Sequence, residues 1–145
     1  MSVDMRQNAD GSVGFLGATL TATASSEGFV PVTVGYNVPA ADTSFFQADR
    51  VYVVKAIRGT NDVIGTGGAC TAVVRKVPSG TAITSGTALH SGSFNLVGTV
   101  NTTQALTLST TGSDLLLAVG DRIAIDYTGT ATSAIGSVTV TLAPA

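Results

Sequence analysis

The sequence predicts an all-β protein, and three observations lead to that class. Short segments of alternating apolar and polar residues recur along the chain, as in strands with one buried and one wet face. Side chains that favour helices are scarce, since the chain has only one glutamate and two lysines, whereas valine and threonine are abundant. Turn-rich stretches separate the alternating segments at short intervals. Together these features are typical of a β-sandwich or β-barrel.

The N-terminal part divides into an arm and the beginning of the domain. Residues 1–12 are polar and aperiodic, so we expect an N-terminal arm there and a single domain over residues 13–145. The segments LGATLTATA (16–24) and FVPVTVGYNV (29–38) alternate as half-buried strands do. In the second of them Pro31 has no N–H to donate, which predicts an edge strand or a bulge.

The next segment, PAADTSFFQADR (39–50), is predicted to contain one helical turn. Ser44 and Gln47 have the spacing of a capping box, and the turn would lie around Phe45 and Phe46. Adjacent phenylalanines in a short element cannot both be fully buried, so we expect an exposed aromatic contact there. The alternative is a hydrophobic plug at the end of the sandwich.

The rest of the chain reads as further strands. RVYVVKAIR (50–58) and ACTAVVRKV (69–77), separated by GTNDVIGTGG, predict a hairpin with a long loop. A Gly/Ser/Thr-rich loop follows at residues 78–93. The other expected strands are FNLVGTVN (94–101), ALTLS (105–109), DRIAIDYT (121–128) and SVTVTL (137–142). This makes about eight strands and no long helix.

Charge and hydropathy disfavour several classes of partner. The net charge is −2 and the seven basic residues are scattered, so nucleic acid is not an expected partner. No window of 18 apolar residues occurs, which predicts no membrane span. The first residues have no apolar core of a secretory signal.

Candidate catalytic and metal-binding residues are few. The single histidine, His90, lies in a loop where a solvated side chain is expected, and the single cysteine, Cys70, opens a strand where burial is expected. A Cys–His pair stays open, but we expect no enzyme, no cofactor and no metal site. Four aspartates could contribute to a calcium site, although no dense loop of acids occurs: Asp62, Asp114, Asp121 and Asp126.

The outward faces of the expected strands are unusually poor in charge. Charged residues make up 11% of the chain, against roughly 25% in ordinary domains, and the outward positions are Thr, Ser, Ala and Gly. Because uncharged edges and faces invite association, we expect copies of the chain or a large partner to cover them.

Three segments resemble a known family. TAVVRKVPSGTAITSGTAL (71–89), FNLVGTVNTTQALTLS (94–109) and LAVGDRIAIDYTGTA (117–131) are similar to capsid decoration (cement) proteins of tailed bacteriophages. The resemblance covers most of residues 29–143. It implies a single-domain antiparallel β-sandwich, jelly-roll-like, that forms a homotrimer at three-fold positions and bridges subunits of the major capsid protein. The protein would be made in the host cytoplasm and reside on the outer surface of the virion.

The resemblance also directs attention to partner contacts. Gly120-Asp121 predicts a turn whose aspartate caps the backbone, and Arg122 would then begin a strand on its outward face, where a charge can orient a docked neighbour. An ordinary Asp–Arg surface pair is the alternative. The expected contact residues are Met1, Val3, Met5, Arg6, Phe45, Phe46 and Arg122. The alternative function is a glycan- or receptor-binding module, such as a fibre tip, which the lack of tryptophan disfavours.

Overall fold

The computed structural model of the chain describes residues 5–7, 13–15 and 28–145. Near the N-terminus, β1 (Met5–Gln7) pairs antiparallel with β2 (Val13–Phe15). The boundary expected between arm and domain, after residue 12, falls between these two strands and stays a prediction. The strand expected at 16–24 lies outside the described residues.

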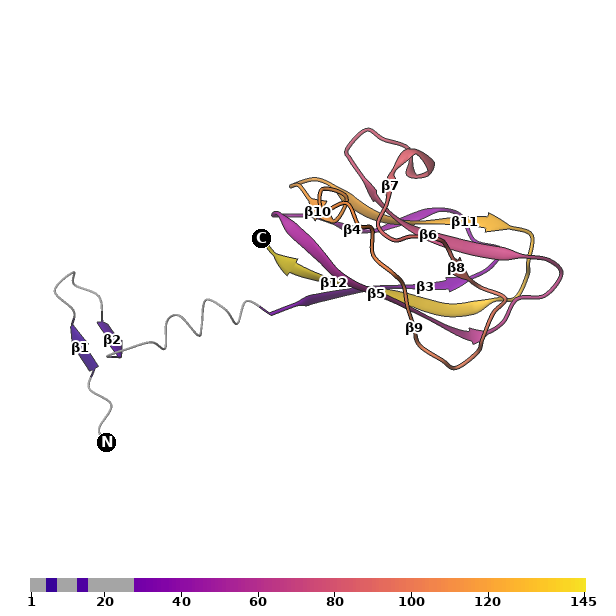
Figure 1. Cartoon of the computed structure of the whole chain (residues 1–145), viewed down its shortest axis with the longest axis horizontal. Helices are drawn as coiled ribbons and strands as arrows, with labels where there is room; N and C mark the ends of the chain where they lie inside the picture. Colours follow the sequence, from indigo (N-terminus) through magenta and orange to yellow (C-terminus); the bar gives the residue numbers. More distant parts are fainter. Residues whose placement is uncertain (1–4, 8–12, 16–27) are drawn as a thin grey trace.

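The remaining strands form two antiparallel sheets of five strands each (Figure 1). The first sheet has the order β10–β5–β12–β3. The short strand β9 pairs with the same edge of β5 as β10 does, but further along β5. Its strands are β3 (Val30–Asn37), β5 (Tyr52–Val63), β9 (Gln104–Ala105), β10 (Leu116–Leu117) and β12 (Ile135–Pro144). The second has the order β4–β11–β6–β7, and β8 also pairs with β6. Its strands are β4 (Thr43–Gln47), β6 (Cys70–Val77), β7 (Thr87–Ala88), β8 (Phe94–Asn95) and β11 (Arg122–Gly129).

The strand order confirms the expected jelly-roll sandwich. Successive long strands alternate between the sheets, since β3 and β5 belong to the first sheet and β4 and β6 to the second, and β11 is followed by β12 in the opposite sheet. One edge position in each sheet is shared by two short strands, β9 with β10 and β7 with β8. Counting each shared edge once gives eight positions, the number in a jelly roll of two Greek keys.

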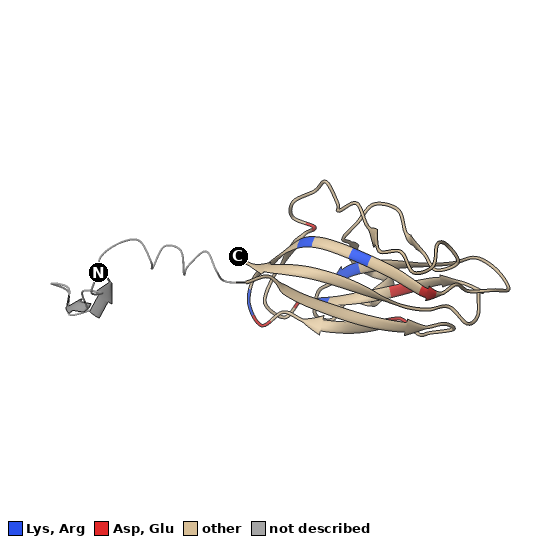
Figure 2. Cartoon of the chain, turned by 90° about the horizontal axis from the view of Figure 1, so that it is seen from below, with Lys and Arg blue, Asp and Glu red and all other residues tan. Residues whose placement is uncertain are grey.

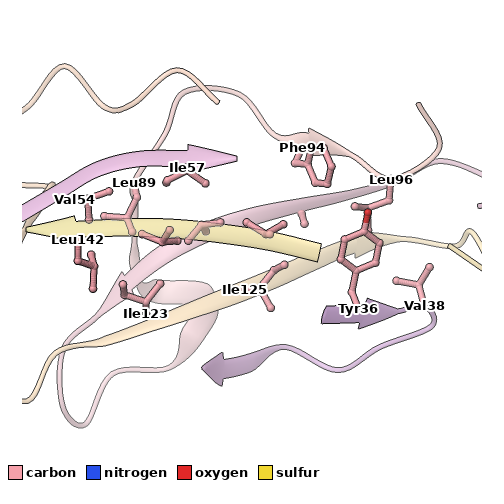
Figure 3. Close-up of a cluster of buried hydrophobic side chains, with 14 of the residues drawn as sticks. Tyr36, Val38, Val54, Ile57, Leu89, Phe94, Leu96, Ile123, Ile125 and Leu142 are labelled. Atoms are coloured by element: carbon pink, nitrogen blue, oxygen red, sulfur yellow. The ribbon is translucent and has the colours of Figure 1, made fainter. Parts of the chain in front are cut away.

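The core fills the space between the two sheets, as Figure 3 shows for its larger side chains. The inward residues of β12 (Val138, Val140 and Leu142) are fully buried, as the alternation of this segment predicts. Tyr36 lies between the sheets and packs edge-on against Phe94, with ring centroids 6.4 Å apart. Burial of such apolar side chains is the main favourable term in folding.

The hairpin expected from residues 50–58 and 69–77 is wrong. These segments become β5 and β6, which lie in different sheets, and β5 runs on to Val63 through residues expected to form a loop. Two buried residues explain the extension. A Cβ at Gly59 would meet the Phe94 ring at 2.6 Å, and the buried Asn61 amide donates to the Asn95 and Thr99 carbonyls at 3.0 and 3.2 Å.

The helical turn expected around Phe45 and Phe46 is also wrong, because this segment is strand β4. Its pairing with β11 shifts between Ile123 and Ala124, so that β4 contains one extra residue, a β-bulge. A bulge lets adjacent side chains turn to similar directions. Both phenylalanines are therefore half-buried against the core instead of pointing to opposite faces.

The strands expected at residues 94–101 and 105–109 are much shorter than predicted. Only Phe94–Asn95 and Gln104–Ala105 are strands, and turns fill most of the remainder. These segments run along the edge of the sandwich, where β8 pairs with two residues of β6 and β9 with two residues of β5. The result is an edge without a long open strand.

Candidate functional site

The charged residues around β11 explain how the outer face of the β4–β11–β6 sheet is built. Arg75 Nε on β6 donates to Asp126 Oδ2 on β11 at 2.7 Å, and the two side chains are 22% and 10% exposed. A second guanidinium nitrogen of Arg75 donates to the carbonyl of Gly86 at 2.9 Å. This ion pair therefore joins two strands and also holds a loop.

Arg122 makes similar contacts at the start of β11. Its two terminal nitrogens donate to the Ser44 hydroxyl at 3.3 Å and to the Thr81 carbonyl at 2.7 Å. The Arg122 side chain is half-buried, and its hydrogen-bond partners belong to the same chain. These partners are Ser44 and Thr81, and not the aspartate of the surface pair considered from the sequence. It ties β4 and the loop after β6 to the same strand.

The turn before Arg122 has the expected cap. The Ala118 amide donates to Asp121 Oδ2 at 2.8 Å, while the Asp121 amide donates to the Ala118 carbonyl at 3.1 Å. Gly120 has φ +89°, a conformation that favours glycine. The aspartate thus caps its turn from the last position.

Residues 78–86 lie over the outer face of β6 and β11 (Figure 1). They include a short 3-10 helix, η1 (Ile83–Ser85), which packs on both strands. Below this cover Ala124 is fully buried although it points away from the core, and Asp126 is 7% exposed. We call the outer side of the β4–β11–β6 sheet the covered face.

Three of the expected contact residues meet in one place. Phe45, Phe46 and Arg122, with Ser44 and Gln47, line an open hollow at the β4 edge. The Phe46 ring also packs edge-on against Tyr52, with centroids 5.5 Å apart. The hollow therefore has apolar walls and a guanidinium at its rim.

The N-terminal contact residues stay predictions. Met5 and Arg6 belong to β1, and Met1 and Val3 lie outside the described residues. Whether these four residues contact a partner is a question for the experiments below.

The outer face of the other sheet carries few charges and is covered by no segment among the described residues, and we call it the open face. Its side chains are exposed or half-buried: Pro31, Thr33, Gly35 and Asn37 on β3, Ser137, Thr139, Thr141 and Ala143 on β12, and Ala56, Arg58 and Thr60 on β5. Figure 2 shows β3 and β12 without charge along their length, whereas β5 carries Lys55, Arg58 and Asp62. Thr33 and Thr139 share a hydrogen bond of 2.8 Å between their hydroxyls. Over β3 and β12 the open face is therefore a surface of small, neutral side chains.

His90 is buried, so the expectation of a solvated side chain is wrong. Its side chain is 3% exposed, and Nε2 accepts a hydrogen bond from the Val74 amide at 3.0 Å. His90 lies between β7 and β8, the two short strands that pair with the same edge of β6. Burial lowers the pKa of His90 below its ordinary value of 6.5, and the nearby Arg75 acts in the same direction. The neutral imidazole thus completes the edge of the sheet.

Cys70 is buried at the start of β6, as expected, and burial raises the pKa of its thiol. No cluster of three or more possible metal ligands occurs among the residues that the structure describes. Within the same ranges no helix is long and apolar enough to cross a membrane.

Besides Asp126 on the covered face, two buried polar residues in turn-rich stretches were missed by sequence reasoning. Asn61 stands in a stretch rich in turn-forming residues, and His90 stands in a Ser/Gly-rich loop, so composition favours exposure at both. Only their long-range partners, the carbonyls for Asn61 and the Val74 amide for His90, make burial favourable.

Comparisons with known proteins give structural similarity only. No protein-family model and no curated protein sequence matches the chain. Solved structures of infectious bursal disease virus are similar: the Gx strain (13% identity, TM-score 0.30, 80% of this chain and 30% of that chain) and the D431N mutant VP2 protein in T=1 particles (12%, 0.33, 91% and 34%). The Gt strain gives 12% identity, a TM-score of 0.27, and coverage of 91% and 36%. The chain spans about a third of the length of these proteins, and at these TM-scores the similarity carries no argument about function.

Proposed function

We propose that the protein is a structural virion protein that decorates a phage capsid. In this proposal it forms a homotrimer at three-fold positions and bridges subunits of the major capsid protein on the outer surface. No catalytic step is assigned to it. The proposal rests on the resemblance in residues 29–143 and on the surface of the sandwich.

The observation that carries the proposal is the open face. A β-sheet face with neutral Thr, Ser, Gly and Ala over two whole strands has few charges that oppose close packing against another protein. From the sequence we expect a partner to cover the uncharged outward residues, and these residues are concentrated on the open face. The outer face of the other sheet is covered by the chain's own loop, which contains η1. Three weak contacts in one trimer reinforce each other because the second and third are intramolecular.

The first experiment is the solution mass of the chain by light scattering over a range of concentrations. We expect a trimer whose mass falls to that of a monomer on strong dilution. In the variant Thr139→Glu a charge enters the middle of the open face, and we expect the trimer to dissociate at concentrations where the original chain is assembled. Ser79→Glu, in the exposed loop on the covered side, is the matched control and should leave the mass unchanged.

A monomer at every concentration contradicts assembly in solution. Binding to heads of the phage then decides between a decoration protein that assembles only on its capsid and a glycan- or receptor-binding module. Retention on heads supports decoration, and retention only on a glycan array overturns it.

The N-terminal contact residues have a separate test. Deletion of residues 1–10 should leave the thermal unfolding of the sandwich unchanged but lower occupancy on heads. Equal occupancy with and without these residues removes the arm from the contact surface.

A further inference from the structure

The β3 edge of the first sheet lacks a neighbour among the described residues. β3 pairs with β12 on one side only. Its inward side chains Val30, Val32 and Val34 are only half-buried, whereas those of the adjacent β12 are fully buried. The core is therefore incompletely covered along this edge.

The backbone of β3 also offers unused hydrogen-bonding groups. The Val38 amide donates to the Ala134 carbonyl at 2.9 Å, on the β12 side. Because backbone groups alternate along a strand, the even-numbered residues of β3 face β12, and Thr33 and Gly35 face outward. Pro31 has its nitrogen on the outward side too, where a missing N–H breaks no bond to β12.

This edge has little protection against an added strand. β3 is eight residues long and carries no charge, in contrast to the opposite edges of both sheets, which are divided into two-residue strands. Proteins usually blunt such edges with short strands, lysines or bulges. The single proline near the start of β3 is the one such device on it.

We propose that residues 16–24 of the same chain add to this edge as an antiparallel strand. The segment ends five residues before β3, and residues 25–29 (SSEGF) contain turn-forming Ser and Gly, so a hairpin with a five-residue loop connects them. Close attachment makes this segment a more concentrated partner than any separate chain.

The register of this hairpin matches the two faces. A five-residue loop pairs residue 24 with residue 30, so the sum of paired numbers is 54. Leu and Ala then lie opposite the half-buried valines: Ala24–Val30, Ala22–Val32 and Leu20–Val34. The threonines at positions 19, 21 and 23 lie on the same side as Thr33 and extend the open face. A loop shorter by one residue would place the threonines over the core instead.

The proposal fixes where the N-terminal arm leaves the sandwich. Because the added strand runs antiparallel to β3, residue 16 lies beside Val38. That end is opposite the C-terminus, since Val30 pairs with Leu142. This inference stands independently of capsid decoration, because it concerns the sheet and not the partner.

Amide hydrogen exchange of the full chain, read by NMR, tests the proposal. We expect slow exchange at the Thr33 and Gly35 amides. In the proposed register the Thr21 amide bonds to β3 and the Ala22 amide points away. Thr21→Pro should therefore accelerate exchange at Thr33 and Gly35 by about tenfold, whereas the matched control Ala22→Pro should not.

Three outcomes overturn the proposal. Fast exchange at Thr33 and Gly35 in the original chain shows that the edge is open. An equal effect of the two proline variants rejects the register. Protection that disappears on dilution means that a second copy, and not the same chain, supplies the strand; protection that persists on dilution supports the hairpin.

Discussion

The two outer faces of the sandwich belong to sheets of similar size, but they differ in charge and in what covers them. On the covered face two cations bind carbonyls of the neighbouring loop: Arg75 binds Gly86 at 2.9 Å, and Arg122 binds Thr81 at 2.7 Å. On the open face the outward side chains of β3 and β12 are small and neutral, and no described segment covers them.

The difference between the two faces indicates that the few charged residues around β11 stabilise contacts within the chain. Around β11 they hold the chain to itself, because each has a partner within the fold. The neutral face is the one left available to other molecules. If this division is right, substitutions on the covered face change stability and those on the open face change association.

The largest effect on stability is expected for Arg75→Ala. The substitution leaves the Asp126 carboxylate buried without its cation, which costs about 3 kcal/mol of the free energy of unfolding. Urea denaturation measures the loss. Arg50→Ala is the control, because the Arg50–Asp49 pair spans 3.8 Å and both side chains are mostly exposed. Similar losses in the two variants would refute the role given to the covered face.

A smaller loss of stability is expected in mild acid. The folded chain holds His90 neutral, with its pKa below 6.5, whereas the unfolded chain takes up a proton near 6.5. The unfolded state therefore binds more protons as the pH falls below 6.5, and the free energy of unfolding decreases there. The urea midpoints at pH 7 and pH 5 measure this change.

The His90→Gln variant isolates the imidazole from the carboxylates that titrate at lower pH. Glutamine keeps an acceptor but does not titrate, so the difference between the two midpoints should shrink. An unchanged difference would assign the acid effect to other groups.

Arg122→Ala should act locally. Loss of its bonds to Ser44 and Thr81 is worth about 1 kcal/mol and should loosen the loop that contains η1. Faster hydrogen exchange at the Ser85 and Gly86 amides, which bond within that loop, reports the change. Lys55→Ala on β5 should leave both amides as they are, and acceleration in that variant as well would contradict a local effect.

The smallest effect on stability is expected on the open face. Thr139→Ala removes one exposed hydroxyl pair and should change the free energy of unfolding by less than about 0.5 kcal/mol. Thermal unfolding measures it. A loss as large as that of Arg75→Ala would mean that the open face holds the monomer together.

Sequence reasoning succeeds where one strand has one buried and one wet face. The alternation of SVTVTL gives the inward residues of β12, and Pro31 indicates the edge position that β3 has among the described strands. It fails for β11, where Ala124 and Asp126 are buried on the outward side, because the loop that covers them is distant in sequence. The alternation of apolar and polar residues shows which side chains share one side of a strand, but it does not show which distant segment packs on that side.

The candidate site is predictable in part for the same reason. Phe45, Phe46 and Arg122 stand out by residue type, and the pairing of β4 with β11 brings them together. The bulge that turns both phenylalanines toward the core has no local signature in SFFQ. The buried His90 depends on an amide sixteen residues away, which no local pattern reveals.

The pairing of β3 with β12 has a consequence for the rate of folding. It joins Val30 to Leu142, so β3 cannot pair with β12 until the last strand has been synthesised. Closing a loop of this length has an entropic cost that must be met before the contact stabilises anything, and β-sandwiches with such distant pairings fold in milliseconds to seconds. During that interval the edge of the uncharged β3 that later pairs with β12 is exposed, and the concentration of nascent chains then influences whether each one folds alone or aggregates.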